Sequence, residues 1–148
     1  MDPKSTVQAL MYAVQMGDFE KARSYLADDF QFSGPVTKSI GAKAWLGMSM
    51  NLKKAFPNLE YHFRVESVQS DGVVKISSEL KGAHRGDLDL TDMNMGVISV
   101  TNKSFAAARE HGKITVKGDK VASWTVEPTK GAGLAAILEL LDVKLPVM

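Results

Sequence analysis

Apolar residues change their spacing about halfway along the 148-residue chain, and this change limits the folds that it can adopt. Between Asp2, a good helix cap, and Gly17, apolar side chains recur every three or four residues, at Val7, Leu10, Met11 and Val14. That spacing predicts an amphipathic helix. Farther along, apolar and polar residues alternate, with the apolar set at Leu59, Tyr61, Phe63 and Val65. Alternation predicts a half-buried strand. Helices followed by strands predict an α+β fold, with helices packed on one face of a curved, mostly antiparallel sheet.

The same two patterns locate the other expected elements. One helix should follow Asp18, and another should run over about residues 39–56, where Pro57 ends it. A short strand with Phe30 and Phe32 on one side precedes that helix. Further strands are expected from residue 73 and over roughly 96–101, 104–117 and 120–127. A last amphipathic helix carries Leu134, Ile137, Leu138 and Leu141.

The composition excludes several classes of function. A formal net charge of +1 provides no electrostatic attraction to nucleic acid or to an anionic membrane. The chain has no cysteine for disulfides or metal sites, and its three histidines lack ligand-like spacing. It also lacks phosphate-binding and dinucleotide motifs, so we expect neither a cofactor nor a metal. Because no secretory signal and no apolar run of about 20 residues is visible, we expect a cytoplasmic protein without a membrane span.

The stretch KGAHRGDLDL, residues 81–90, places a histidine, an arginine and two carboxylates close together. If it continues the strand that begins at Val73, His84 shares the apolar face, whereas Arg85, Asp87 and Asp89 point to water. The glycines on either side of the histidine leave space around it or allow a close approach. A bulge at either glycine would exchange the two faces beyond it, and the sequence leaves that alternative open.

Four stretches, in order along the chain, resemble the NTF2-like superfamily and more narrowly its SnoaL-like (polyketide cyclase-like) branch. They are GDFEKARSYLADDFQFSGP, AFPNLEYHFRVESV, GAHRGDL and KVASWTVEPTKGAGLAAILELL. The resemblance implies a single domain over residues 1–148 that folds as a cone, with a curved sheet wrapped by helices around one deep pocket. Members are often homodimers. Their activities include aldol-type ring closure, isomerisation, dehydration and epoxide opening, while some members only bind a ligand.

The resemblance also implies candidate site residues. His84 matches the histidine of the family's Gly-Thr-His-x-Gly strand and would act as a hydrogen-bond donor or a general acid/base; alternatively it is an internal histidine bonded to a neighbour. Glu127 is the carboxylate nearest to the position of the family's acid–base aspartate, and it could carry out the same proton transfer. Alternatively, it is a solvated carboxylate at the strand end, because the alternation places it on the face opposite that of Trp124. The pocket lining would comprise Tyr12, Trp45, Tyr61 and Trp124.

Two functions from different classes remain open. The first is a cofactor-independent enzyme that transfers a proton on a small, largely apolar carbonyl compound, as a cyclase, isomerase or dehydratase does. The second is a non-catalytic ligand-binding or assembly module with the same pocket. Gly34 stands where isomerase-type members carry the aspartate that removes the proton, so ketosteroid isomerisation by that route is not expected. Small outer residues on the later strands favour a homodimer that pairs through its sheets.

Overall fold

The computed structural model describes residues 2–34, 37–91, 96–127, 131 and 133–141. Three helices belong to the first part of the chain: α1 (Pro3–Met16), α2 (Phe19–Ser24) and α3 (Ala42–Ala55). The strands are β1 (Leu26–Gly34), β2 (Thr37–Gly41), β3 (Arg64–Val68), β4 (Val73–Ser78), β5 (Lys81–Ala83), β6 (Leu88–Asp89), β7 (Val97–Ile98), β8 (Ser104–Ala106), β9 (Glu110–Lys117) and β10 (Lys120–Val126). A fourth helix, α4 (Gly133–Leu140), follows the last strand. The expected order of helices and then strands is confirmed, with two early strands between α2 and α3.

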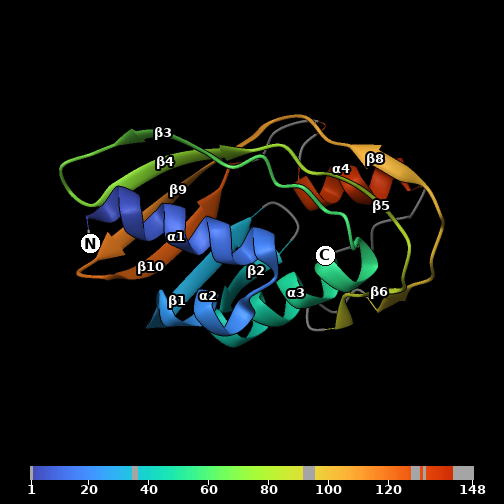
Figure 1. Ribbon diagram of the computed structural model, residues 1–148, viewed down its shortest axis with the longest axis horizontal. Coiled ribbons are helices and arrows are strands. Elements are labelled where there is room, and N and C mark those ends of the chain that lie inside the picture. Colours follow the sequence, from blue (N-terminus) through green and yellow to red (C-terminus); the bar gives the residue numbers. More distant parts are fainter. Residues whose placement is uncertain (1, 35–36, 92–95, 128–130, 132, 142–148) are drawn as a thin grey trace.

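A six-stranded sheet with the strand order β2-β1-β10-β9-β4-β3 forms the main layer of the molecule. All of its neighbouring strands run antiparallel except β1 and β10, which run parallel. Two short ribbons, β5 with β8 and β6 with β7, extend the structure toward the end opposite the N-terminus (Figure 1). The prediction of an α+β fold with a curved, mostly antiparallel sheet is therefore confirmed.

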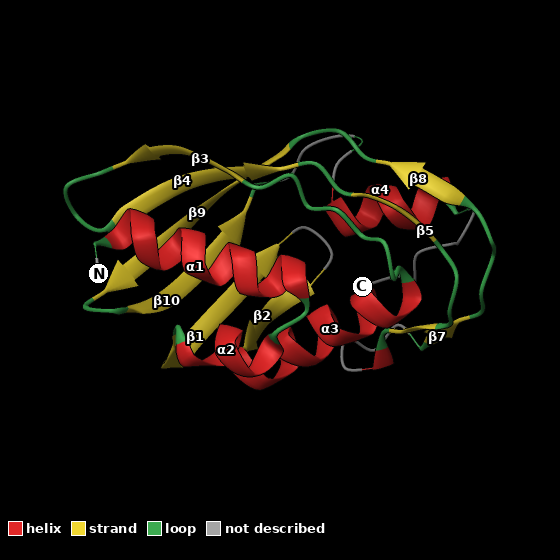
Figure 2. Ribbon diagram, viewed as in Figure 1, coloured by secondary structure: helices red, strands yellow, loops and turns green. Residues whose placement is uncertain are grey.

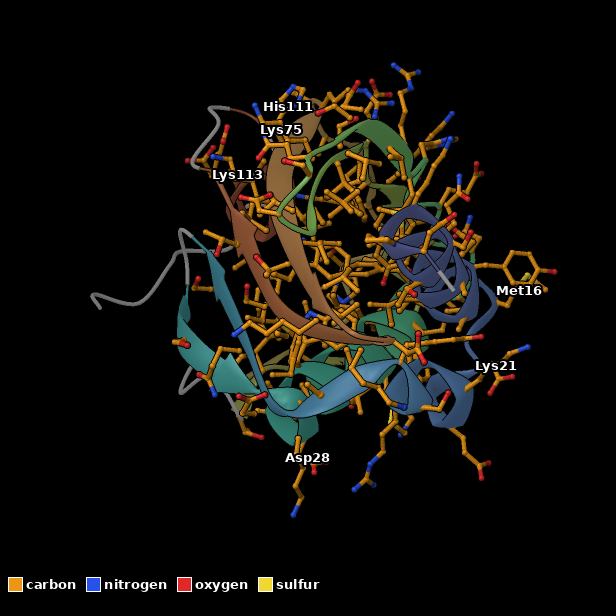
Figure 3. All side chains as sticks on the ribbon, turned by 90° about the vertical axis from the view of Figure 1, so that its left-hand side faces the viewer. Met16, Lys21, Asp28, Lys75, His111 and Lys113 are labelled. Atoms are coloured by element: carbon orange, nitrogen blue, oxygen red, sulfur yellow. The ribbon has the colours of Figure 1, made fainter. Side chains whose placement is uncertain are left out.

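Helices α1, α2 and α3 lie on one side of this sheet. In Figure 2, α1 crosses in front of β9 and β10, and α2 and α3 lie below it along β1. The view in Figure 3, turned by 90°, shows Met16 on the helical side and Lys75, His111 and Lys113 on the other. The sheet thus has an inner face covered by helices and an outer face that carries exposed lysines and a histidine.

Helix caps agree with the sequence. The Asp2 carboxylate accepts a hydrogen bond from the Ser5 N–H (2.7 Å), and Gly17 ends α1 in the left-handed region at φ 77°. The Asp18 carboxylate accepts a hydrogen bond from the Lys21 N–H (3.2 Å) and starts α2. The two aspartates satisfy backbone N–H groups that a helix leaves unpaired at its first turn.

Several element boundaries differ from the sequence prediction. The strand expected from residue 73 breaks into β4, β5 and β6, the one over 104–117 into β8 and β9, and the one over 96–101 shortens to β7. The helix expected from residue 39 begins at Ala42, because Thr37–Gly41 forms β2 and pairs with β1. The strand expected from residue 59 begins only at Arg64. The Gln15 side chain holds the preceding segment: its amide donates to the Leu59 carbonyl (2.9 Å) and accepts from the Tyr61 N–H (2.9 Å).

One hydrophobic core lies between the helices and the inner face of the sheet. The expected stripe of the third helix is buried in it, as is most of the first helix face. The apolar residues of β4, β9 and β10 contribute from the sheet side, at Val74, Ile76, Ile114, Val116, Val121, Trp124 and Val126. Burial of this alternating set is the main driving force that fixes which face of each strand points inward.

Candidate functional site

A group of aromatic side chains covers the centre of the inner face. Trp45 of α3 and Trp124 of β10 meet with ring centroids 5.5 Å apart. The ring centroids of Phe32 and Phe63 lie 6.1 and 6.0 Å from that of Trp124. Tyr61 stacks on Phe63 at 4.8 Å and 7°. Three of the four residues predicted to line a pocket, Trp45, Tyr61 and Trp124, are thus brought into one aromatic cluster, each at most 8% exposed.

Trp124 has a polar atom with no recorded partner. Its indole Nε1 is buried, and within the described part of the chain no hydrogen-bond acceptor reaches it. Gly112 of β9 lies below the ring, because a Cβ atom built on that glycine would be 3.5 Å from Nε1. A buried donor without an acceptor costs about 1–3 kcal/mol, so this N–H is a natural place for a ligand oxygen.

Glu110, which the sequence analysis did not select, lies on the same inner face. It begins β9, two residues before Gly112, and shares the inward alternation of Ile114 and Val116. Its Cα partner on β4 is Ser78, which is also buried. Burial raises the pKa of the Glu110 carboxyl to about 7. A carboxyl with that pKa exists in both protonation states at neutral pH, as a general acid/base must.

His84 is fully buried, with 0% exposure, and its face follows the alternation in the sequence. The Thr101 N–H donates to His84 Nδ1 (3.1 Å), so the proton of the neutral ring resides on Nε2. That Nε2 is buried, and none of the described residues is within hydrogen-bond reach of it. Burial lowers the pKa of His84, which keeps the ring neutral at pH 7. His84 therefore presents a hydrogen-bond donor to the interior.

The ring of His84 packs against a phenylalanine. Its ring lies 5.3 Å from that of Phe56, which in turn meets Phe105 at 5.0 Å. Arg85 and Asp87 are exposed and bond outward to the Asn102 carbonyl and the Val100 N–H. Asp89 caps the short turn at Thr91. The exchange of faces that a bulge could have produced does not occur.

Two predicted site residues lie outside this interior. Glu127 follows β10 and is exposed, and its backbone N–H donates to the His111 carbonyl (2.9 Å). Tyr12 is 67% exposed, on the outer side of α1. It lines a surface groove of about 480 Å³ together with Gln8, Met11, Gln15, Glu60, His62, Phe63 and Val65. Phe63 belongs both to this groove and to the aromatic cluster, so the groove adjoins the interior at that ring.

A larger surface groove, of about 1070 Å³, lies between α2, β1 and α3. Leu26 and Leu46 contribute an apolar floor, and charged side chains border it at Glu20, Arg23, Asp28 and Lys43. None of the buried polar atoms that lack a recorded partner belongs to its lining. The inner face around Glu110 and Trp124 therefore has the stronger chemical case.

Across residues 2–34, 37–91, 96–127, 131 and 133–141, no three His, Asp or Glu side chains are grouped so that they could hold a metal ion. None of the helices described is both long and apolar enough to cross a membrane.

Comparison with known proteins now identifies the family. A family model of SnoaL-like polyketide cyclases matches residues 4–130. The chain belongs to the SnoaL-like polyketide cyclase family. No curated protein matches the sequence at a significant level.

Solved structures share the SnoaL-like fold at low sequence identity. A candidate polyketide cyclase from Pseudomonas putida KT2440 superposes with a TM-score of 0.73 at 13% identity, covering 95% of this chain and 98% of that one. IdmH from Streptomyces antibioticus, also a candidate polyketide cyclase, gives 0.70 at 18% identity, with 97% and 100% covered. A protein from Catenulispora acidiphila with a ketosteroid isomerase-like fold, solved with trimethylamine, gives 0.66 at 14% identity, with 98% and 97% covered. These likenesses establish the fold, and the reaction must be argued from the site.

Within this SnoaL-like fold, Gly34 occupies a position near the aromatic interior. A Cβ atom at Gly34 would lie 3.6 Å from Cβ of Val126 and 3.8 Å from the ring of Phe32. These are ordinary contact distances, so the site has room for a side chain but carries none. The carboxyl group of this interior comes instead from Glu110 on β9.

Proposed function

We propose that this protein is a cofactor-independent enzyme that transfers a proton on a small, largely apolar carbonyl compound bound against the inner face of the sheet. Glu110 is the general acid/base. The observation that carries the proposal is that burial brings the pKa of this carboxyl to about 7 on the face that the aromatic cluster covers. Proton transfer is most effective when the pKa of the catalytic group lies close to the working pH.

The family name suggests the substrate class, a compound with several carbonyl groups along one chain. Glu110 removes a proton from a carbon next to a carbonyl, and the electrons of the C–H bond move to the carbonyl oxygen to form an enolate. The enolate carbon can then attack a second carbonyl of the same molecule, forming a C–C bond. The resulting alkoxide takes the proton back from Glu110, so the carboxyl returns to its starting state.

Glu110 takes the role that sequence reasoning gave to Glu127. The reason is exposure: Glu127 faces water at the end of β10, whereas Glu110 is half-buried on the inner face. His84 remains a candidate for a second role. Because its ring is neutral and carries its proton on Nε2, we propose that it donates a hydrogen bond to the ligand rather than transferring a proton.

The test uses 2-tetralone, a bicyclic ketone with an acidic methylene group, in deuterated buffer at pH 7. Proton NMR follows the loss of the methylene signal with wild-type protein, Glu110→Gln and Glu127→Gln. We expect wild type and Glu127→Gln to accelerate the exchange equally, and Glu110→Gln to lose roughly 10²-fold or more of the acceleration. Equal acceleration by Glu110→Gln and wild type would contradict the assignment.

A non-catalytic ligand-binding module is the second candidate, and one observation favours it. Gly34 provides no side chain at the position where isomerase-type relatives carry their base. If wild-type protein binds 2-tetralone and does not accelerate exchange at any pH from 5 to 9, the binding module replaces the enzyme.

We also propose that the chain acts as a single domain, in the cytoplasm, and as a homodimer. The continuous hydrophobic core that joins α1, α3, α4 and the sheet supports the single domain. The outer face of β10, which carries Ser123 and Thr125, has the short side chains that face-to-face sheet packing requires.

A further inference from the structure

We propose that the indole N–H of Trp124 donates the hydrogen bond that holds the carbonyl oxygen of the ligand while Glu110 removes a proton from the adjacent carbon. This inference rests on the proposed function, and it narrows the ligand to ketones whose acidic C–H is directly next to the carbonyl. Trp124 then acts in the reaction and does not serve only as an apolar wall.

The first argument is the unsatisfied donor. Trp124 is 6% exposed, its Nε1 is buried, and no acceptor from the described residues reaches it. Most buried polar side-chain atoms in proteins have a partner, and those that do not require an explanation. A carbonyl oxygen from the ligand would supply the missing acceptor.

The second argument is that the ring is held in place. The indole packs against Trp45 at 5.5 Å, Phe32 at 6.1 Å and Phe63 at 6.0 Å. These three rings come from α3, β1 and the segment before β3, so several elements share the task of positioning it. A donor that is already aimed loses little entropy when the ligand binds, and this preorganisation is what makes such donors effective.

The third argument is the close approach of two strands beside the N–H. Gly112 has no side chain, and a Cβ atom there would be 3.5 Å from both Trp124 Nε1 and Ile76 Cδ1. That Cβ atom would also be 2.8 Å from the Thr125 carbonyl oxygen, so β9 and β10 approach too closely here for any residue but glycine. The terminal methyl group of Ile76 borders the same position, so it is the side-chain group that a ligand beside this glycine would displace.

The fourth argument is the position of Glu110 relative to this donor. Glu110 and Gly112 are two residues apart on one strand and face the same side, which places their Cα atoms about 7 Å apart. The indole N–H lies over the glycine, and the carboxyl comes from the next inward position. The proposal places the C=O group of the ligand at the donor and its neighbouring carbon at the carboxyl.

The chemistry requires both groups at once. As the proton leaves the carbon for Glu110, negative charge develops on the carbonyl oxygen. A hydrogen bond to that oxygen becomes stronger with the charge, so the indole N–H stabilises the transition state more than the bound ketone. The hydrophobic surroundings strengthen the effect because water does not screen the interaction.

The experiment follows the indole N–H itself by NMR. The chain has two tryptophans, so ¹⁵N-labelled protein gives two indole signals, and Trp45→Phe assigns them. Glu110→Gln protein, which should not exchange the probe, is titrated with 2-tetralone and separately with tetralin, the matched hydrocarbon without the carbonyl. We expect the Trp124 indole proton to move downfield with 2-tetralone and to show no comparable shift with tetralin.

A second measurement uses Trp124→Phe, which keeps an aromatic ring and removes the donor. We expect its affinity for 2-tetralone to fall about tenfold, the effect of one hydrogen bond, while its affinity for tetralin changes little. If this variant does not fold, the indole signal in the otherwise native chain still decides the question.

Several results would overturn the inference: an unchanged Trp124 signal with bound 2-tetralone, an equal shift with tetralin, or no binding of 2-tetralone up to its solubility limit. The outcome is separable from that of the proposed function. Exchange catalysis without an indole shift defeats only the role of Trp124, whereas an indole shift without exchange catalysis by wild type defeats only the role of Glu110.

Discussion

The indole nitrogen of Trp124 lies over Gly112, so close that a Cβ atom on that glycine would be 3.5 Å from Nε1. The two residues belong to neighbouring antiparallel strands, β10 and β9. Because glycine adds nothing above the backbone, the N–H and the inward side chain of Glu110 border the same small region of the inner face. This arrangement, rather than any single residue, makes the inner face a plausible centre for proton transfer.

Replacement of Glu110 should change how stability depends on pH. A carboxyl whose pKa rises from an unfolded value near 4.5 to about 7 binds more protons in the folded protein. Its contribution to the free energy of unfolding is therefore fully present below pH 4.5 and is lost as the pH rises to about 7. We expect urea denaturation at pH 5 and pH 8 to show this in the free energy of unfolding. The value for Glu110→Gln minus that for wild type should be up to about 3 kcal/mol larger at pH 8 than at pH 5. A difference that is independent of pH would contradict the burial of this group.

Shortening Ile76 should make room for the ligand. Ile76→Val removes the Cδ1 methyl group, which borders the same position above Gly112 as the indole nitrogen, and should cost about 1 kcal/mol of stability. We expect 2-tetralone to bind this variant more tightly than wild type in calorimetric titrations. Ile114→Val is the matched control, because Ile114 is also fully buried on the inner face and should lose stability without any gain in affinity. Equal or weaker binding by Ile76→Val would show that this methyl group does not limit access.

His84 should matter for stability whether or not it meets a ligand. In His84→Ala the part-buried Thr101 N–H loses its acceptor, which should cost roughly 1–3 kcal/mol. Asp87→Ala removes an acceptor for the Val100 N–H at an exposed position, where water can replace it, and should cost less than about 1 kcal/mol. Thermal or urea unfolding of the two variants compares them directly. A larger loss for Asp87→Ala than for His84→Ala would reverse the roles given to these two side chains.

The proposed homodimer can be tested by placing a charge on the outer face of the sheet. Ser123→Glu should break sheet-to-sheet packing, because a buried unpaired carboxylate is strongly unfavourable. Light scattering should then fall from twice the 16.1 kDa chain mass to that of one chain. Lys21→Glu, on the exposed side of α2, is the control and should leave the mass unchanged. A wild-type mass of one chain at micromolar concentration would exclude the dimer.

The alternation of side chains predicted the faces of residues 84–90 even though the expected strand breaks into β4, β5 and β6. The prediction succeeded because His84, Leu88 and Leu90 are all buried, so the even-numbered side chains still point inward although the strand is interrupted. The segment before β3 could not be predicted in the same way. Gln15, more than 40 residues earlier, holds its backbone, and no local pattern reveals so distant a contact.

The candidate site was predicted only in part. The apolar alternation of β9 already placed Glu110 on the side of Ile114 and Val116, but the family resemblance directed attention to Glu127. Burial of the tryptophans could be expected from their apolar faces. The unpaired N–H of Trp124 could not, because it depends on which acceptors the folded chain brings near and on how closely the strands approach at Gly112.

The most direct test of the account is the pKa of Glu110, measured by ¹³C NMR of the side-chain carboxyl in labelled protein, with Glu110→Gln to assign the signal. The account predicts a midpoint at about 7 for this carboxyl. A midpoint near the ordinary glutamate value of about 4.3 would mean that the carboxyl is solvated, and it would remove the general acid/base from the proposed reaction.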